Sequence, residues 1–234
     1  MTDFSAALSL AGSLVFQLDH RLIAIVLLSL RVSLLAVALA SVFGLPLGAT
    51  VALARFPGRN AIVLVLNAFM GLPPVVVGLT IYLLLSRAGP LGPLGMLFTP
   101  TAMVVAQMVL ILPIIAALTR QVVEDLWEEY SEQLRSLGCG RAQAVPTLLW
   151  DGRYRLATVI LAGFGRASAE VGAVIIVGGN VAGFTRTMTT AIALETSRGD
   201  LPLAMALGLI LITLTIAVNG VIQLVSQHAR RGMG

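Results

Sequence analysis

Long apolar stretches alternate with short polar ones along this chain. Five of them reach the roughly 20 residues that a helix needs to cross a bilayer: residues 25–54, 61–86, 99–118, 156–177 and 203–225. A further apolar stretch, residues 4–18, is too short to span and follows an acidic start, so we expect an interfacial helix there rather than a signal peptide. The pattern predicts an all-α integral membrane protein, with an interfacial segment at 1–24 and one transmembrane domain at 25–234.

Glycine and proline residues interrupt two of the predicted spans. Gly44, Pro46 and Gly48 lie in the first span, and the spacing of the two glycines permits close approach of a neighbouring helix. Pro73 and Pro74 lie in the middle of the second span, where they remove two amide donors. The pair therefore predicts a kink near the middle of the bilayer.

The longest polar interval, Glu124 to Asp151, separates the third span from the fourth. Its first part carries an apolar stripe at helical spacing: Trp127, Tyr130, Leu134 and Leu137. Gly138 and Gly140 are expected to end that helix, because glycine accepts the left-handed backbone of a C-terminal cap. A stubby second helix over 141–145 follows, limited or bent by Pro146. Residues 121–155 are therefore predicted to form a helical hairpin, and a solvated hairpin without a partner is an open alternative.

Composition excludes several functional classes. The chain is 58% hydrophobic and 11% charged, whereas soluble domains carry roughly 25% charged residues. The net charge of +4 comes from arginine alone, and without lysine there is no phosphate-binding P-loop, so any ATP must bind to a partner. These arginines favour loops beside anionic lipid over nucleic acid, since no basic run with interleaved aromatics occurs. One cysteine, Cys139, and two distant histidines predict neither a disulfide nor a metal cluster.

The polar interval resembles the cytoplasmic loop of ABC importer permeases. That loop reads Glu-Ala-Ala, three residues, Gly, nine residues and Ile-x-Leu-Pro; Glu132 and Gly138 match, whereas the alanines and the final proline are replaced. Longer blocks resemble the permease subunit of tungstate importers, relatives of the molybdate permeases. They begin near Leu27 and comprise these stretches: Leu30 to Ser33, Phe56 to Arg59, Asn67 to Gly78, Tyr82 to Leu94, Phe98 to Met103, Phe164 to Ala167, Glu170 to Ala173, Gly178 to Asn180 and Thr185 to Ser197.

The resemblance implies a type I ABC importer fold and a homodimeric permease without a catalytic site or cofactor of its own. Its implied partners are two ATPase subunits, which hold ATP and Mg²⁺, and an extracytoplasmic oxyanion-binding protein. The implied cargo is tungstate, with molybdate, sulfate or another anion as alternatives. In the family the short helix after the glycine docks on the ATPase, and carried over, that contact falls on Arg141, Ala142, Gln143, Ala144 and Val145. The wider set implied for coupling to the ATPase also includes Glu132, Gly138, Cys139 and Gly140.

Arg166 and Glu170 are the charges placed deepest in a predicted span. A charge at mid-membrane costs about 2.5–3.5 kcal/mol on insertion scales, so such residues usually face partners or water. Four residues apart on one predicted helix, they can pair with each other. Either the pair fixes helix packing, or it lies beside the pathway and offsets the charge of an anion. The helix around Pro73 is likewise either a kink or a gate, together with these neighbours: Asn67, Met70 and Pro74.

A threonine-rich segment, residues 184–198, follows the fourth span and is predicted to be a short helix or a re-entrant piece. It offers a cation and hydroxyl donors that suit a tetrahedral oxyanion on the outer side: Thr185, Arg186, Thr187, Thr189 and Thr190. A solvated loop and a contact surface for the binding protein are alternatives that the sequence leaves open.

The arginines are distributed unequally between the two sides of the predicted spans. Nine lie on the side of the polar interval and the C-terminus, and five lie on the other side. The positive-inside rule therefore puts the interval and the C-terminus in the cytoplasm and the N-terminus outside, as expected for a prokaryotic inner-membrane protein. A proton-driven transporter that uses Glu170 is the rival from another class, and it would not need the polar interval. A membrane enzyme is less favoured, because the spans carry no nucleophile–base pair or metal-ligand cluster.

Overall fold

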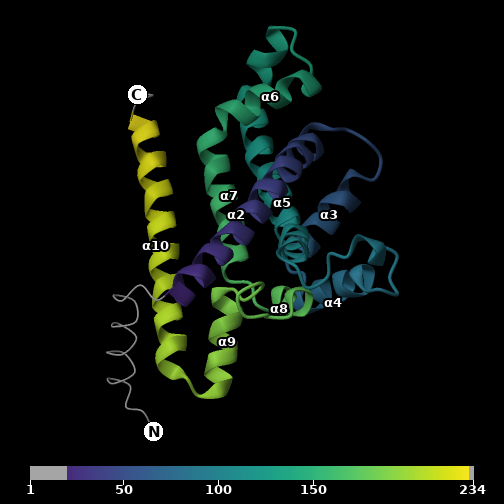
Figure 1. Cartoon of the computed structure of the whole chain (residues 1–234). Coiled ribbons are helices and arrows are strands. Elements are labelled where there is room, and N and C mark those ends of the chain that lie inside the picture. Colours follow the sequence, from purple (N-terminus) through teal and green to yellow (C-terminus); the bar gives the residue numbers. More distant parts are fainter. Residues whose placement is uncertain (1–19, 232–234) are drawn as a thin grey trace. The chain divides into compact units, whose positions relative to one another are not determined.

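The computed structural model describes residues 20–231, and within that range the regular elements are all helical (Figure 1). In lipid a helix satisfies its own backbone groups, which favours this outcome for apolar stretches. The predicted interfacial helix at 4–18 lies outside the described residues. In chain order the elements are α2 (His20–Leu53), α3 (Arg59–Phe69), α4 (Pro74–Leu85), the short 3₁₀ helix η1 (Gly92–Leu94), α5 (Pro100–Ser136), α6 (Arg141–Asp151), α7 (Arg153–Ser168), α8 (Gly172–Gly178), α9 (Met188–Arg198) and α10 (Leu201–Arg231).

Three of the described helices are long and apolar enough to cross a membrane. They are α2 from Leu22 to Leu53, α5 over its whole length, and α10 from Leu201 to Gly220. Two helix pairs, α3 with α4 and α7 with α8, qualify as interrupted spans, which raises the number to as many as five. The predicted all-α membrane protein with about five spans is thus confirmed.

One predicted interruption and two predicted boundaries need correction. First, α2 continues through Pro46, because membrane helices tolerate a proline where neighbouring groups satisfy the freed carbonyl. Second, α5 does not stop near residue 118 but carries the third span into the polar interval as one helix, up to Ser136. Third, the fourth span is not continuous to Val177, since it ends at Ser168 and resumes at Gly172.

The helices form two compact units, and each unit is assembled from separate segments. Unit 1 comprises the described residues up to Ala36 together with Pro73–Gln107 and Ala167–Asn219. Unit 2 comprises Val37–Leu72, Met108–Arg166 and the described residues from Gly220 onward. The long helices α2, α5, α7 and α10 each contribute residues to both units.

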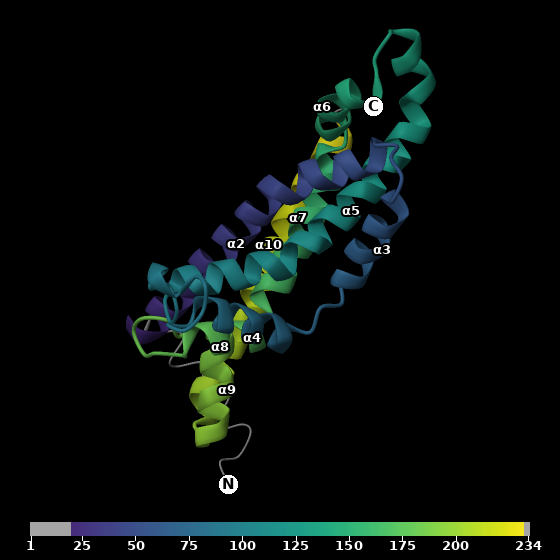
Figure 2. The same ribbon diagram turned by 90° about the vertical axis from the view of Figure 1, so that its right-hand side faces the viewer.

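Within unit 1, α4 and α8 lie side by side (Figures 1 and 2). Glycine permits this approach, because a Cβ on Gly78 would lie only 2.7 Å from Ala173 Cα. A separate apolar cluster joins the start of α2 to α9 and α10 through Leu22, Met188 and Leu207. Unit 1 is therefore packed around the second halves of both interrupted spans and around the α9–α10 pair.

Within unit 2, α2 and α5 approach each other at two glycines. A Cβ on Gly48 would lie 2.3 Å from the carbonyl oxygen of Ala116, and one on Gly44 would lie 3.0 Å from Ile115 Cγ2. The predicted role of this glycine pair in close helix packing is confirmed. The core that also holds α6 is formed by these buried residues: Ala49, Leu53, Val123, Leu126, Ala144 and Leu148.

Candidate coupling and translocation sites

The last turn of α5 ends at a glycine, as the sequence predicts. Gly138 has a φ of 74° and donates its N–H to Arg135 O at 2.9 Å, while the N–H of Cys139 reaches Leu134 O at 2.9 Å. These two bonds form a Schellman motif, in which the glycine supplies the left-handed residue. Leu137 is 82% exposed and leaves the predicted apolar stripe, whose other members pack on the core of unit 2.

The second helix of the hairpin is longer than predicted. α6 runs Arg141–Asp151, so Pro146 lies inside it and does not end it near Val145. The proline is exposed. It has no N–H to donate to the carbonyl four residues earlier, that of Ala142, and this exposed residue can bond to water instead. Gln143 holds the start of α6, since its side-chain Oε1 accepts the N–H of Gly140 at 2.9 Å.

One face of α6 is buried and the other is exposed. Ala144 is 0% exposed and Leu148 is 1% exposed, so both residues anchor α6 in unit 2 and present no surface. Glu132, at the end of α5, is exposed. The open face of α6 ends at a large aromatic ring that is 71% exposed, and it consists of these residues: Ala142, Gln143, Pro146, Thr147 and Trp150.

Two arginines bind the free carbonyls at the end of α2. Arg59 donates from Nε to Val51 O at 2.9 Å and from Nη2 to Ala52 O at 3.3 Å. Arg141 donates from Nη1 to Leu53 O at 3.4 Å. The last carbonyls of a helix are unsatisfied and carry partial negative charge, which makes both contacts favourable. The first residue of α6 is thereby tied to the last turn of α2.

Glu124 on α5 completes this arginine cluster, because it pairs with both Arg59 and Arg120. The guanidinium carbon of Arg141 lies 5.5 Å from the ring centroid of Trp127, within cation–π range. Desolvation lowers the pKa of Arg141, and repulsion adds to that shift from three neighbours: Arg55, Arg135 and Arg59. The guanidinium remains a cation at neutral pH.

The second span breaks between α3 and α4, where the sequence predicts a kink. Pro73 has an extended backbone, with φ −65° and ψ 120°, and its carbonyl accepts the N–H groups of Val76 and Val77. Pro73 and Pro74 carry no N–H, so the start of α4 has two fewer donors to satisfy. The prediction of a proline interruption at this point is confirmed.

The fourth span breaks around Glu170, where the sequence predicts a continuous helix. α7 ends at Ser168, so the prediction that Arg166 and Glu170 share one helix face is wrong. Glu170 is 4% exposed and caps α8, with its Oε1 accepting the N–H of Ala173 at 3.0 Å. The hydroxyl of Thr189 donates to Glu170 O at 2.8 Å. The carboxylate thus serves a helix N-terminal donor, which a continuous helix would not offer.

The residues predicted to line a pathway are divided between the units. Asn67, Met70 and Arg166 belong to unit 2, whereas the Pro73–Pro74 pair and Glu170 belong to unit 1. Asn67 is exposed on α3, and Met70 and Arg166 are partly exposed. A role for them in the pathway stays a prediction.

The threonine-rich segment is folded inward. Thr185 donates to Gly178 O at 2.6 Å and accepts the N–H of Val181 at 2.9 Å. The Oγ1 of Thr190 accepts the N–H of Thr187 at 3.0 Å and so caps α9. The solvated-loop alternative is wrong, because four threonines of the segment are buried, with exposed fractions of 1% for Thr185, 4% for Thr187, 9% for Thr189 and 0% for Thr190. An anion bound here would have to compete with existing hydrogen bonds for their hydroxyl groups.

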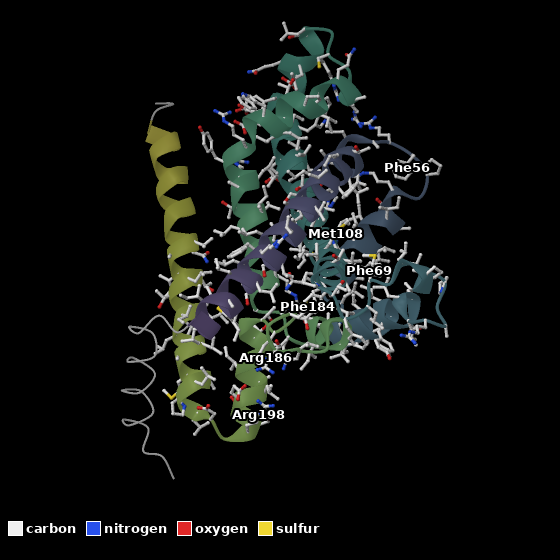
Figure 3. All side chains as sticks on the ribbon, in the orientation of Figure 1. Phe56, Phe69, Met108, Phe184, Arg186 and Arg198 are labelled. Atoms are coloured by element: carbon white, nitrogen blue, oxygen red, sulfur yellow. The ribbon has the colours of Figure 1, made fainter. Side chains whose placement is uncertain are left out.

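Arg186 and Arg198 lie at opposite ends of α9 (Figure 3) and share one carboxylate. The Nη1 atoms of these arginines lie 3.7 Å and 3.4 Å, respectively, from Glu195 Oε1, and the Glu195 side chain is 9% exposed. Sequence reasoning missed Glu195, and it missed Glu124 in unit 2 as well. The available signal was an arginine three or four positions away on the same helix: Arg198 for Glu195 and Arg120 for Glu124.

Comparison with known proteins places these features in a family context. The model for the family described as binding-protein-dependent transport system inner membrane component matches residues 44–231. A tungstate uptake system permease protein of Peptoclostridium acidaminophilum is 39% identical over 212 residues, which cover 91% of this chain and 93% of the relative. A probable anion ABC transporter permease protein of Haloferax volcanii is 39% identical over 203 residues, or 85% and 88% of the two chains. A tungstate uptake permease of Campylobacter jejuni is 36% identical over 206 residues, or 88% and 86%.

Proposed function

The chain belongs to the family of binding-protein-dependent transport system inner membrane components, and from this we propose that it is the permease subunit of an ABC importer for tungstate. The observation that carries the substrate is a difference among relatives. Those named as tungstate uptake permeases are 36–39% identical over 88–91% of the chain. Those named as sulfate permeases are 28–32% identical.

Competitive uptake tests the substrate. Cells with and without the gene receive tungstate, molybdate and sulfate together at low concentration, and mass spectrometry measures tungsten, molybdenum and sulfur in the cells. We expect tungsten uptake to be lost without the gene and restored by a plasmid copy of the chain. Loss of molybdenum or sulfur uptake with unchanged tungsten uptake would overturn the assignment. An unchanged content of all three elements would reject transport of these oxyanions altogether.

The ATP-driven step belongs, in this proposal, to two partner ATPase subunits that bind ATP and Mg²⁺, while two copies of this chain enclose the pathway. The surface offered to an ATPase is the open face of α6, which Ala144 and Leu148 hold in place from beneath. Arg141 gives motion of α6 a direct route to α2, since it donates to the carbonyl of Leu53. A push on α6 then moves the end of a membrane span.

A matched pair of aromatic truncations tests this docking face. Trp150 is 71% exposed on α6, and Phe184 is 51% exposed in unit 1 before α9. Because a large exposed ring is a usual anchor of an interface, we expect Trp150→Ala to lower the amount of ATPase that copurifies with the chain. We expect Phe184→Ala to leave that amount unchanged. Equal copurification of both variants with the ATPase would reject the open face of α6 as the contact.

The proposed orientation puts α6 and the C-terminus in the cytoplasm, as the arginine distribution favours. Cys139, the single cysteine, lies in the turn before α6 and is partly exposed. A membrane-impermeant maleimide is expected to leave Cys139 unlabelled in intact cells and to label it after the membrane is permeabilised. Labelling in intact cells at the same rate would reverse the topology.

A further inference from the structure

A small cavity within unit 1, lined by polar and apolar side chains, lies next to the break in the fourth span. Its volume is about 10 Å³, at the lower limit for one water molecule. Residues from α2, from α5, from the end of α7, from the start of α9 and from α10 line it. The polar members of the lining are Ser29, Ser33, Gln107, Ser168, Thr187 and Thr189.

Among the described residues that line this cavity, Gln107 has a buried side-chain atom without a hydrogen-bond partner. It is 3% exposed, and its Nε2 donates to Ala167 O, in the last turn of α7, at 3.1 Å. Its Oε1 accepts no hydrogen bond from the residues whose side chains the structure describes, 22–220. An amide oxygen has two acceptor sites, and its burial without a donor costs free energy. A donor in the cavity beside this atom would therefore stabilise the fold.

The hydroxyls around the cavity can complete such a site. The Oγ of Ser29 donates to Ile25 O at 2.8 Å and accepts the N–H of Met188 at 2.7 Å, which leaves one acceptor lone pair. Thr189 uses its hydroxyl hydrogen on Glu170 O. The hydroxyls of the other lining residues, Ser33, Ser168 and Thr187, can each donate or accept, and the lining includes no carboxylate. A small neutral molecule that both donates and accepts hydrogen bonds fits this environment, whereas an oxyanion is too large for a volume of about 10 Å³.

We infer that this cavity binds one water molecule, which donates one hydrogen bond to Gln107 Oε1 and the other to a hydroxyl oxygen of the lining. A span that stops at Ser168 and resumes at Gly172 exposes backbone carbonyls at membrane depth. Gln107 and Thr189 satisfy two of them, and the bound water satisfies Gln107 in turn. The water is thus part of the structure that holds the break between α7 and α8 open.

Hydroxyl-radical footprinting of the purified full-length chain tests this site directly. X-ray pulses split water into radicals, and a bound water marks the side chains nearest to it even where bulk water does not reach. Met188 lines the cavity and is 3% exposed, while Met103 is 0% exposed and does not line it. We expect oxidation of Met188 to be several-fold faster than oxidation of Met103. In Gln107→Leu the acceptor is gone, so the rate at Met188 is expected to fall to that at Met103.

A second variant and a change of buffer cation test the water site further. If Gln107→Leu does not fold, Ser33→Val narrows the cavity from α2 and is expected to lower oxidation of Met188 in the same way. Exchange of sodium for choline in the buffer is expected to leave the melting temperature unchanged. Equal oxidation of Met188 and Met103 in the wild type would overturn the water site. A melting temperature that rises with sodium would overturn it in favour of a cation.

Discussion

The second and fourth spans are both broken, but opposite chemistry breaks them. Before α4, Pro73 and Pro74 remove N–H donors, so little remains there to satisfy. Before α8, Glu170 provides an acceptor instead, and its carboxylate takes the N–H of Ala173 while Thr189 serves its carbonyl. A helix end within a membrane must have its free groups satisfied by the protein. The first break is therefore fixed by the backbone itself, whereas the second depends on side-chain contacts and is easier to destroy.

The largest effect is expected where the two spans depend on each other, at the contact between α4 and α8. A Cβ on Gly78 would lie 2.7 Å from Ala173 Cα, and a backbone atom cannot move aside as a side chain does. We expect Gly78→Val to exceed the usual overpacking cost of about 1–3 kcal/mol and to abolish the folded chain. The measurement is the fraction that remains monodisperse on size exclusion after heating.

A matched glycine controls for the substitution itself. A Cβ on Gly208 in α10 would meet nothing within 4 Å in this chain, so Gly208→Ala is expected to melt like the wild type or slightly above it. If Gly78→Val melts like Gly208→Ala, the stability of α4 and α8, the second halves of the two interrupted spans, does not depend on their contact. Each break is then stabilised independently of the other.

The next effect in size concerns the carboxylate of the second break. Glu170→Ala leaves the N–H of Ala173 buried without its acceptor, at a cost of about 1–3 kcal/mol. Glu170→Gln keeps an oxygen of the same reach, so we expect it to recover most of the melting temperature that Glu170→Ala loses. Tungstate uptake is measured on both variants. If Glu170→Gln is as stable as the wild type but transports no better than Glu170→Ala, the negative charge acts in transport and not only as a cap.

The first break could be predicted from the sequence and the second could not, for a physical reason. The break that a proline causes in a helix can be predicted from the sequence alone, because proline lacks the amide hydrogen in every structural context. Glutamate is compatible with a helix interior, and Arg166 four residues earlier made a helical ion pair the simplest interpretation. Only the fold brings Thr189 and the start of α8 to Glu170. For the same reason Gln107 and Glu195 were not recognised from the sequence, whereas Gly48 and Gly138, whose roles follow from lacking a side chain, were predicted correctly.

A smaller stability effect but a clear functional one is expected at the first break. The double variant Pro73→Ala/Pro74→Ala restores two N–H groups and allows α3 and α4 to join into one helix. We expect its free energy of unfolding to change by less than about 1 kcal/mol, because the backbone before and at the first turn of α4 accommodates proline without strain. We expect slower tungstate uptake with ATPase copurification unchanged. Uptake at the wild-type rate would reduce the break to a kink without a role in gating.

A last effect, on stability alone, separates two of the contacts that Glu170 makes: the bond that its carboxylate accepts and the bond that its carbonyl accepts. Thr189→Val keeps the shape of the side chain and removes the hydroxyl that donates to Glu170 O, which costs about 0.5–1.5 kcal/mol for one neutral hydrogen bond. Thr80 on α4 is the control, because its hydroxyl donates to Val76 O within the same helix and is exposed. Thermal melting of both variants decides the point. A loss in Thr189→Val as large as that in Glu170→Ala would mean that the carboxylate and the hydroxyl act as one network. No loss at all would mean that the hydroxyl of Thr189 does not help to stabilise the second break.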